Sequence, residues 1–589
     1  MTGRRVRPAG EARAAVLVAV AAAFVAAVDL VRLARPALLL DPDAAWTLPR
    51  LLLWLGVGAG AGAAGIAAAA LFGIFAGGPL ASVDEAAVPF WRGTLAAIAL
   101  AALAAGAALR LCFLDGTTRG FFQDHISLVE PTLALSGTWR DFADAIRPVP
   151  FGVKEPFGVI GVLYLEAFRW SLRRFGVTVF GIQFLSAATG TLCLATAGAL
   201  GRRLLPRGGG ALSILALAGM RWPLILSQWG YHGIAVTPVL DVASLAMIAS
   251  RQRDRGRWAA ASGLAAGVAA HVYLSAWIGA AALGLFAAWP GELAGSAARR
   301  LRRVALFAAG FTAAAAPLFL LRDARSVAYF ERPAHHSAWL EIRRTGSPLP
   351  PFAAAADALV APWFLSDPIP RHDLPGRTRL GPILGVVVGL ALLRALLRPG
   401  REVSAFLLSQ AGAALAAAVA GGQAFLPHGF RFAYLSTVTA VAAAAGVLAL
   451  LGALPESRRR AGAIAATGLL ALSGALGARD ALLAWPAREE TFEAFAGQDY
   501  LIGRAAARWE NFGAVRLEDG LGFSPITIGT VFRHRIGEPP ANSRRDRPRA
   551  FRVAPPGAAA EPGERVVERV DDPWGRPRAL VFGRRGPPA

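Results

Sequence analysis

The feature that most constrains this chain is a series of long apolar segments rich in Ala, Leu, Val and Gly. Many of them have about 17–25 residues, the length with which a helix crosses roughly 30 Å of hydrocarbon. The 589-residue chain is 55% hydrophobic and 17% charged, whereas a soluble protein carries about a quarter of charged residues. We therefore predict an all-α polytopic membrane protein.

The positive charge of the chain reflects its topology rather than a nucleic-acid partner. The formal net charge is +22, but the Arg clusters lie in short loops between apolar segments, where the cytoplasmic loops of membrane proteins carry their basic residues. Nucleic-acid binding, the usual interpretation of so basic a chain, is therefore excluded. Cys112 and Cys193 both lie inside apolar segments, so we predict neither a disulfide framework nor a thiolate metal site.

The Arg clusters also orient the apolar segments. About 13 spans, with the N-terminus in the cytoplasm and the C-terminus outside, place each major Arg cluster between spans on the inner side. The expected spans cover about residues 14–28, 51–75, 93–114, 178–200, 212–226, 234–249, 259–270, 276–288, 304–321, 380–397, 406–419, 433–451 and 463–483. The apolar segment 157–168 is too short to span and is followed by Arg residues, so we expect an interfacial helix there.

Composition divides the chain into three regions. Residues 1–92 form a two-span extension, and residues 93–485 form a transmembrane core with outer loops at 115–177 and 322–379. Residues 486–589 are polar and rich in Pro and Arg, so we expect a small α/β domain outside the membrane. Its expected elements are a helix at 490–510 and strands at 514–517, 526–532, 551–553, 565–570 and 579–582.

Two acidic positions in the first outer loop are candidates for chemistry. Asp124 follows a span, and a carboxylate that is partly desolvated at the interface can act as a general base. The alternative is a solvated helix cap. Glu155 lies beside Lys154, the only lysine of the chain, and this pair can hold a phosphate or orient an acceptor. The alternative is an ordinary surface ion pair.

Basic side chains gather on the same outer side in this topology: His232, His271, Arg371, His372, His428 and Arg431. Guanidinium and imidazolium groups suit the phosphate of a lipid-linked substrate, because they match phosphate oxygens in charge and geometry. The alternative is that each snorkels at the interface. His335–His336 and His372–Asp373 show no spacing diagnostic of a metal site, so we expect no metal or other cofactor.

These segments, taken in order, resemble bacterial membrane glycosyltransferases of the GT-C fold. The relatives are the dolichyl-phosphate-mannose protein mannosyltransferases, which are glycosyltransferase family 39-like, and the aminoarabinose transferases of lipid A. The resemblance covers roughly residues 93–483. Its elements are the pair Asp124–His125, where the family commonly has Asp–Glu, the element Lys154–Glu155–Pro156, and the segments 189–205, 216–233, 367–385 and 427–446.

The resemblance implies a GT-C-like core of 11 spans that transfers a sugar from a polyprenyl-phosphate donor to a glycan, lipid or protein acceptor. The reaction would take place at the outer face of the bacterial cytoplasmic membrane, with inversion. Asp124 would be the catalytic carboxylate, assisted by Glu155. The substrate-binding residues would be His125, Lys154, Tyr231, His232, Arg371, His372, His428 and Arg431.

Two other classes of function compete with this interpretation. A transporter or flippase of lipid-linked sugars would show inverted repeats and charges at mid-membrane. No repeat is apparent, and the polar residues collect outside the spans, with Arg221 and Asp241 as exceptions. A scaffold that only displays the C-terminal domain would not need a cluster of acid, His and Arg residues on its outer side.

Overall fold

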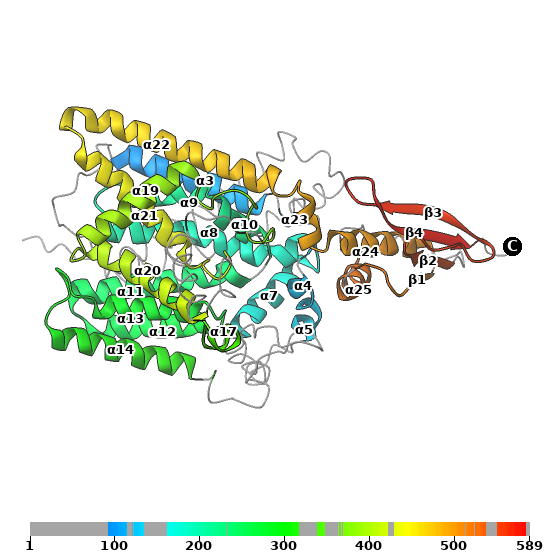
Figure 1. The fold of residues 1–589 in the computed structure, drawn as a ribbon, viewed down its shortest axis with the longest axis horizontal. Helices are drawn as coiled ribbons and strands as arrows, with labels where there is room; N and C mark the ends of the chain where they lie inside the picture. Colours follow the sequence, from blue (N-terminus) through cyan, green and yellow to red (C-terminus); the bar gives the residue numbers. More distant parts are fainter. Residues whose placement is uncertain are drawn as a thin grey trace, which may run out of the picture.

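The structure is a computed structural model, and it describes residues 92–112, 114, 120–121, 123–134, 162–230, 232–316, 318, 338–347, 363, 367, 369–421, 429–512, 514–522, 525–536 and 550–584. The first two expected spans, at 14–28 and 51–75, lie outside these residues. A body of helices is joined to a smaller domain that contains a β-sheet (Figure 1).

Twelve helices make up most of the body within the described residues. They are α3 (Arg92–Leu111), α8 (Val179–Leu204), α9 (Gly209–Ala218), α10 (Arg221–Gln228), α11 (Val236–Arg253), α12 (Gly256–Ala270), α13 (Ala276–Ala288), α14 (Ala297–Ala315), α19 (Gly381–Leu397), α20 (Glu402–Gly421), α21 (Leu435–Ala453) and α22 (Glu456–Arg479). Shorter elements complete it: α4 (Gln123–Ile126), α5 (Val129–Ala134), α7 (Val162–Phe175), η2 (His232–Ala235), α17 (Ala338–Thr345) and the single π-turn η4 (Asp480–Ala484).

Length and hydropathy make six of the described helices able to cross a membrane. These segments are Gly93–Leu111, Val179–Leu204, His232–Arg253, Glu402–Ala420, Leu435–Ala453 and Glu456–Ala484. Two further apolar helices, α13 and α19, are shorter. The structure thus contains the predicted helical architecture with several possible spans, while the number of about 13 spans stays a prediction.

The expected span at 212–226 is wrong as a single helix. The structure breaks it into α9 and α10, which are bent by 61° relative to each other. The break falls at Gly219, where a Cβ would lie 2.2 Å from the carbonyl oxygen of Gly474. Only glycine leaves room for the backbone of α22 to come this close. Packing against a helix that is distant in the sequence therefore sets the position of the bend.

Charged groups inside the body are paired or hydrogen-bonded, because an isolated charge in hydrocarbon is costly. Arg251 on α11 forms an ion pair with Glu402 on α20, with Nε 2.5 Å from Oε1. Asp241 accepts hydrogen bonds from Thr196 on α8 and Thr437 on α21. These contacts join helices that are far apart in the sequence and fix their register.

The smaller domain, here called the sheet domain, covers the described residues between 489 and 584. Helices α23 (Glu489–Ala494) and α24 (Gly497–Trp509) lead into it, followed by η5 (Glu510–Phe512), β1 (Ala514–Leu517), α25 (Pro525–Arg533), β2 (Ala550–Ala554), β3 (Glu564–Asp571) and β4 (Pro577–Arg584). The strand order is β1-β2-β4-β3, with β1 and β2 parallel and the other pairs antiparallel.

The sheet domain is a small α/β unit of the expected kind, with one correction. The segment expected as a strand at 526–532 is the helix α25. Its β-branched residues favour a strand, but Ile528 and Val531 pack against Gly503 of α24, and this packing overrides the local preference. Ile528 also belongs to the apolar core between the helices and the sheet, together with Phe551 and Val581.

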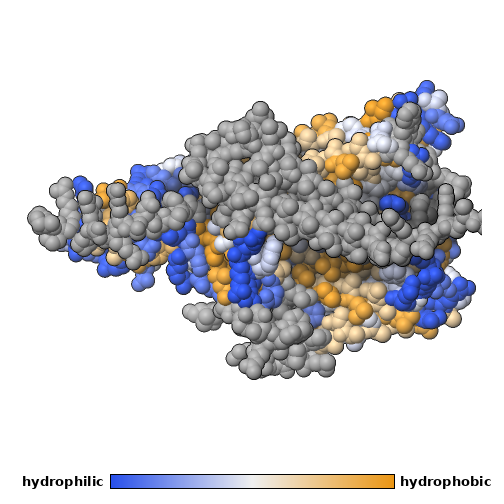
Figure 2. Space-filling model, turned by 180° about the vertical axis from the view of Figure 1, so that it is seen from behind, coloured by the Kyte–Doolittle hydropathy of each residue, from blue (hydrophilic) through white to orange (hydrophobic). Residues whose placement is uncertain are grey.

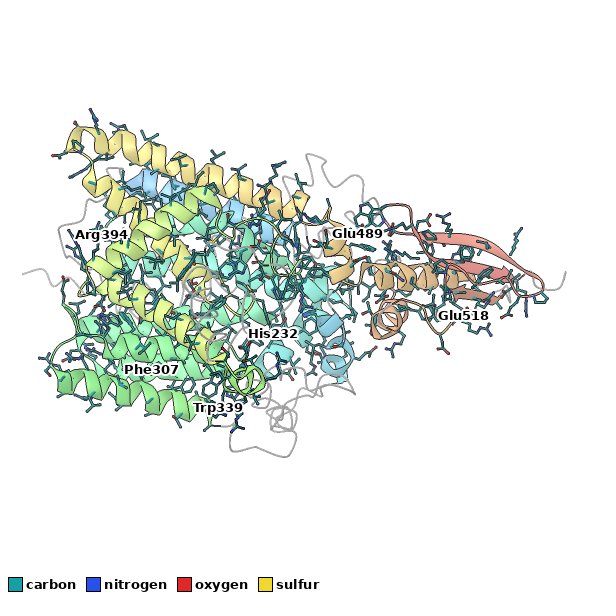
Figure 3. All side chains as sticks on the ribbon, viewed as in Figure 1. His232, Phe307, Trp339, Arg394, Glu489 and Glu518 are labelled. Carbon is teal, nitrogen blue, oxygen red and sulfur yellow. The ribbon has the colours of Figure 1, made fainter. Side chains whose placement is uncertain are left out.

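Polarity is distributed along the long axis of the molecule. Hydrophobic residues gather on the helical body, and hydrophilic residues gather on the sheet domain and at the opposite end (Figure 2). Arg394 lies at that opposite end, whereas Glu489 and Glu518 lie on the side of the sheet domain (Figure 3). Helix α22 runs along the helical body, from the end opposite the sheet domain to the end that faces it (Figure 1), as expected for a helix that crosses a membrane.

Candidate active site at the end of the body that faces the sheet domain

Helix α4 carries Asp124 at the end of the body that faces the sheet domain (Figure 1). The side chain of Asp124 lies outside the part of the chain that the structure describes. Phe121, just before the helix, packs edge-on against Tyr500 of α24 at a ring distance of 5.4 Å. The helix therefore lies between the membrane body and the sheet domain.

His125 anchors α4 to the body. Its Nε2 lies 3.0 Å from the carbonyl oxygen of Ile182 on α8, and its ring packs against Phe168 of α7 at 4.6 Å. A carbonyl only accepts, so Nε2 carries the hydrogen. Burial lowers the pKa of His125 to about 3, which keeps the ring neutral. His125 thus holds α4 against α7 and α8.

Aromatic and imidazole rings from six segments meet in one cluster, here called the ring cluster. Its members are Tyr164 and Phe168 on α7, Trp229 after α10, His232 on η2, Tyr273 after α12, His372, Phe430 and Phe495. Phe430 is central, because its ring lies within 6.0 Å of His232, 5.7 Å of His372 and 5.5 Å of Trp229. His232 lies inside the body, on the side of the sheet domain (Figure 3).

A second group of side chains, the polar cluster, adjoins the ring cluster through His372, and all its members but the half-buried Asp480 are buried. Its members are Arg221, Asp367, His372, Asp373, Arg379 and Asp480. Asp367 accepts hydrogen bonds from the N–H groups of Ile369 and Gly429, at 3.0 and 2.5 Å. The same carboxylate lies 3.4 Å from Arg379 Nη2 and 3.3 Å from His372 Nδ1.

Arg221 ties the polar cluster to the spans. It begins α10, directly after the break in the span, and its Nε lies 2.7 Å from Asp373 Oδ1. The same guanidinium lies 3.3 Å from Asp480 in η4 and donates to the carbonyl of Thr378 at 2.8 Å. A planar guanidinium can serve several acceptors at once, so one residue holds the loop 369–380 against two helices.

The charge states of Asp367 and His372 follow from their surroundings. Burial alone would raise the pKa of Asp367, but the contact with His372, the charge of Arg379 and the Gly429 N–H lower it below its ordinary value. Burial, assisted by the charges of Arg371 and Arg379, lowers the pKa of His372 despite the neighbouring carboxylate. At neutral pH an ionised Asp367 therefore faces a neutral imidazole.

The start of the sheet domain and the turn that leads into it contact both clusters. Trp485 donates from Nε1 to the carbonyl of Pro370 at 2.5 Å, and its ring packs edge-on against Phe495 at 5.5 Å. Phe495 in turn lies 6.3 Å from Trp229. On another side, Glu130 of α5 pairs with Arg533 and His534 at 3.2 and 3.1 Å. The two domains therefore meet at the candidate site.

The residues expected from the sequence fall into three groups. The structure brings together His232 and His372, which both contact Phe430. Arg371 directly precedes His372 in the chain, and Arg431 directly follows Phe430. His125 and His271 are held by the carbonyls of Ile182 and Ala314, respectively. Lys154, Glu155, Tyr231 and His428 lie outside the described residues, as do His335 and His336.

Sequence reasoning missed most of the polar cluster. Asp367, Asp373 and Arg379 lie in the segment 367–385, where the sequence predicts a role for Arg371 and His372 only, and the sequence shows Arg221 only as a charge near a span. The sequence did contain a signal for this cluster. Arg221 lies inside an apolar segment, and the otherwise apolar chain carries acidic residues that can pair with it. The described residues contain no group of three His, Cys, Asp or Glu side chains that could hold a metal ion, and the absence of a cofactor stays a prediction.

The body and the site together define a helical, membrane-type protein with a buried polar cluster under a small α/β domain. No family model matches the chain, and no curated protein matches it by sequence. Among solved structures, the chain is similar to ArnT from Cupriavidus metallidurans in the apo state. The two share 13% sequence identity with a TM-score of 0.45, and the match covers 84% of this chain and 97% of that chain.

Proposed function

We propose that this protein is an integral-membrane glycosyltransferase that uses a polyprenyl-phosphate sugar. The observation that carries the proposal is the convergence of His232 and His372 on Phe430, beside Arg431, at the end of the spans. Aromatic faces together with imidazole and guanidinium groups suit a sugar phosphate, because rings pack on sugar faces and cations match phosphate oxygens. The apolar surface of the body suits the lipid tail (Figure 2).

The proposed reaction is a single displacement. The Asp124 carboxylate takes the proton of an acceptor hydroxyl, whose oxygen forms a bond to the anomeric carbon of the donor sugar. The bond from that carbon to the phosphate oxygen breaks, and its electron pair leaves with the polyprenyl phosphate. One displacement inverts the anomeric configuration. Arg371, His428 and Arg431 stabilise the charge on the leaving phosphate, the neutral ring of His372 packs beside them, and Glu155 with Lys154 orients a substrate.

The proposed location is the bacterial cytoplasmic membrane, with the sheet domain outside and the N-terminus in the cytoplasm. The distribution of charge supports this orientation. Arg394 lies at the end opposite the sheet domain (Figure 3), and cytoplasmic loops are the ones enriched in Arg. The candidate site then faces the outer side, where lipid-linked donors present their head groups.

One observation favours a second candidate function, a flippase of lipid-linked sugars. The bend of 61° between α9 and α10, with Arg221 at the break, is typical of the discontinuous helices that line transport sites. In this second function the ring cluster binds the same head group, but moves it across the membrane without breaking the glycosidic phosphate bond.

The test is a transfer assay with the purified full chain in detergent. A panel of radiolabelled polyprenyl-phosphate sugars is incubated with membrane acceptors, and the product is analysed for its anomeric configuration. Transfer with inversion is the expected result. Transfer with retention would overturn the single displacement. Binding of a donor without any transfer, together with movement of that donor across proteoliposomes, would replace the transferase by the flippase.

A further inference from the structure

Helix α17 exposes two large apolar side chains next to each other. It covers Ala338–Thr345, within the loop 322–379 that the sequence places outside the membrane, and none of its residues is buried. Trp339 is 61% exposed and Leu340 is 43% exposed. Trp339 is the most exposed tryptophan among the residues that the structure describes. Neighbouring exposed side chains of this size indicate a surface that binds a partner.

Two arginines follow the apolar residues on the same short helix. The guanidinium carbon of Arg343 lies 5.0 Å from the centre of the Trp339 ring, and Arg344 is exposed beside it. Glu341 is the only acidic residue of the helix, so the net charge of α17 is positive. A guanidinium that stacks on an exposed indole holds a positive charge above an apolar surface, as side chains at a membrane interface do.

The position of α17 matches the boundary between lipid and water. The helix contacts α20, which is able to cross a membrane, and it lies at the end of the body that faces the sheet domain (Figure 1). Trp339 lies at the margin of the body, whereas His232 lies inside it (Figure 3). Tryptophan is enriched where spans leave the hydrocarbon, because its ring is apolar and its N–H is polar.

A second exposed indole lies at the same end of the body. Trp170 on α7 is 46% exposed. Like α17, α7 carries two arginines in its last turn, Arg173 and Arg174. A docked protein would cover one patch, whereas a bilayer contacts the whole margin of the body at one depth. The repetition of an exposed tryptophan with two arginines on a separate helix therefore favours a lipid surface over a protein partner.

We propose that α17 is an interfacial helix that binds phospholipid head groups of the outer leaflet. The Trp339 ring lies between the acyl chains and the head groups, and the guanidinium groups of Arg343 and Arg344 contact lipid phosphates, which they match in charge and geometry. This surface goes beyond the proposed function, because it requires a bilayer but no sugar transfer. Only the choice of the outer leaflet rests on the proposed orientation.

The experiment places the photoreactive residue benzoylphenylalanine at position 339 of the full chain, in liposomes that contain a radiolabelled phospholipid. Two positions of similar exposure are the controls: Leu472, 51% exposed on the span α22, and Phe512, 52% exposed in the sheet domain. After irradiation, position 339 should carry as much label as position 472. It should carry at least about tenfold more label than position 512, because a ring at the interface is surrounded by lipid.

Two results of this experiment would overturn the proposal. One is label at position 339 no stronger than at position 512, and the other is a cross-link from position 339 to a second copy of the chain in place of lipid. The liposomes contain no polyprenyl-phosphate sugar, so neither result depends on the transferase. Conversely, an absence of sugar transfer leaves the labelling of position 339 as expected.

A conservative variant gives a second readout without the photoreactive group. The chain has 15 tryptophans, so the fluorescence of Trp339 is obtained as the difference between wild type and Trp339→Phe. Lipids brominated near the head group should quench this difference, and aqueous iodide should not, because the ring is surrounded by lipid. Quenching by iodide alone would contradict an interfacial ring.

The two arginines are tested through the choice of lipid. Wild-type side chains at positions 343 and 344 should direct the label from anionic phospholipid to position 339 more than the label from zwitterionic phospholipid, because basic side chains attract anionic lipids at a membrane surface. Arg343→Gln/Arg344→Gln should reduce this preference several-fold. An unchanged preference would contradict contact between these arginines and the head groups.

Discussion

At the scale of single residues, Arg221 shows how a charge is accommodated at the end of an apolar body. Its guanidinium contacts the carboxylates of Asp373 and Asp480 and two backbone carbonyls. A buried pair is costly to form, but removing one partner is worse, because it leaves the other charge buried and unpaired. Arg221 is therefore needed to neutralise the charges of Asp373 and Asp480.

Replacing Arg221 by Met should destabilise the protein by about 3–5 kcal/mol, the usual cost of breaking a buried ion pair from one side. Thermal melting in detergent should show a drop of the transition by several degrees. The double variant Arg221→Met/Asp373→Asn should recover part of the loss, because it also removes the stranded carboxylate at 2.7 Å. If Arg221→Met melts at the same temperature as the wild type, the ion pairs of Arg221 contribute nothing to the free energy of unfolding.

At the scale of elements, glycines decide where helices meet. Helix α22 approaches the break between α9 and α10 so closely that a Cβ on Gly477 would lie 2.3 Å from the carbonyl oxygen of Gly219. Close approach of backbones through small residues is a common way to pack helices in membranes. Gly468 lies on the same helix, but a Cβ there would meet nothing within 4 Å.

The two glycines of α22 give a matched pair of variants. Gly477→Ala should lower the melting temperature, because the new methyl group meets backbone that cannot give way. Gly468→Ala should leave it unchanged or raise it slightly, because Ala favours a helix over Gly by roughly 0.5–1 kcal/mol. Equal shifts for the two variants would indicate that α22 does not pack as described.

Local sequence predicts these elements well where hydropathy alone determines them. The expected spans at 178–200 and 433–451 correspond to α8 and α21 within a few residues. The break at Gly219 and the helix α25 escaped prediction, because each depends on packing against a distant segment. The same holds for the site. His232 and His372 could be assigned to one side from topology, but the Asp367 contacts that position His372 join segments across the chain.

At the scale of the whole molecule, the sheet domain is fixed to the body at the candidate site. Phe495 is fully buried between Trp485 and Trp229, and Tyr500 packs against Phe121 ahead of Asp124. The sheet domain therefore forms one wall of the site. In the proposed reaction, the acceptor would approach past this wall or bind to it.

Phe495→Ala tests whether this contact holds the two domains together. Truncation of a buried Phe costs about 3–5 kcal/mol, so limited proteolysis should release the sheet domain faster from the variant. Phe512→Ala is the control, since Phe512 belongs to the same domain but is 52% exposed. Proteolysis of both variants at the wild-type rate would mean that other contacts suffice to dock the domain.

The measurement that tests the central claim most directly is sugar transfer by wild type and Asp124→Asn, side by side, with the preferred polyprenyl-phosphate donor. Asn keeps the shape of the side chain but cannot take the acceptor proton. The variant should lose at least about 10²-fold in turnover, the usual contribution of a general base. Asp519→Asn, at an exposed position of the sheet domain, should transfer like the wild type. Equal turnover by Asp124→Asn and wild type would contradict the account.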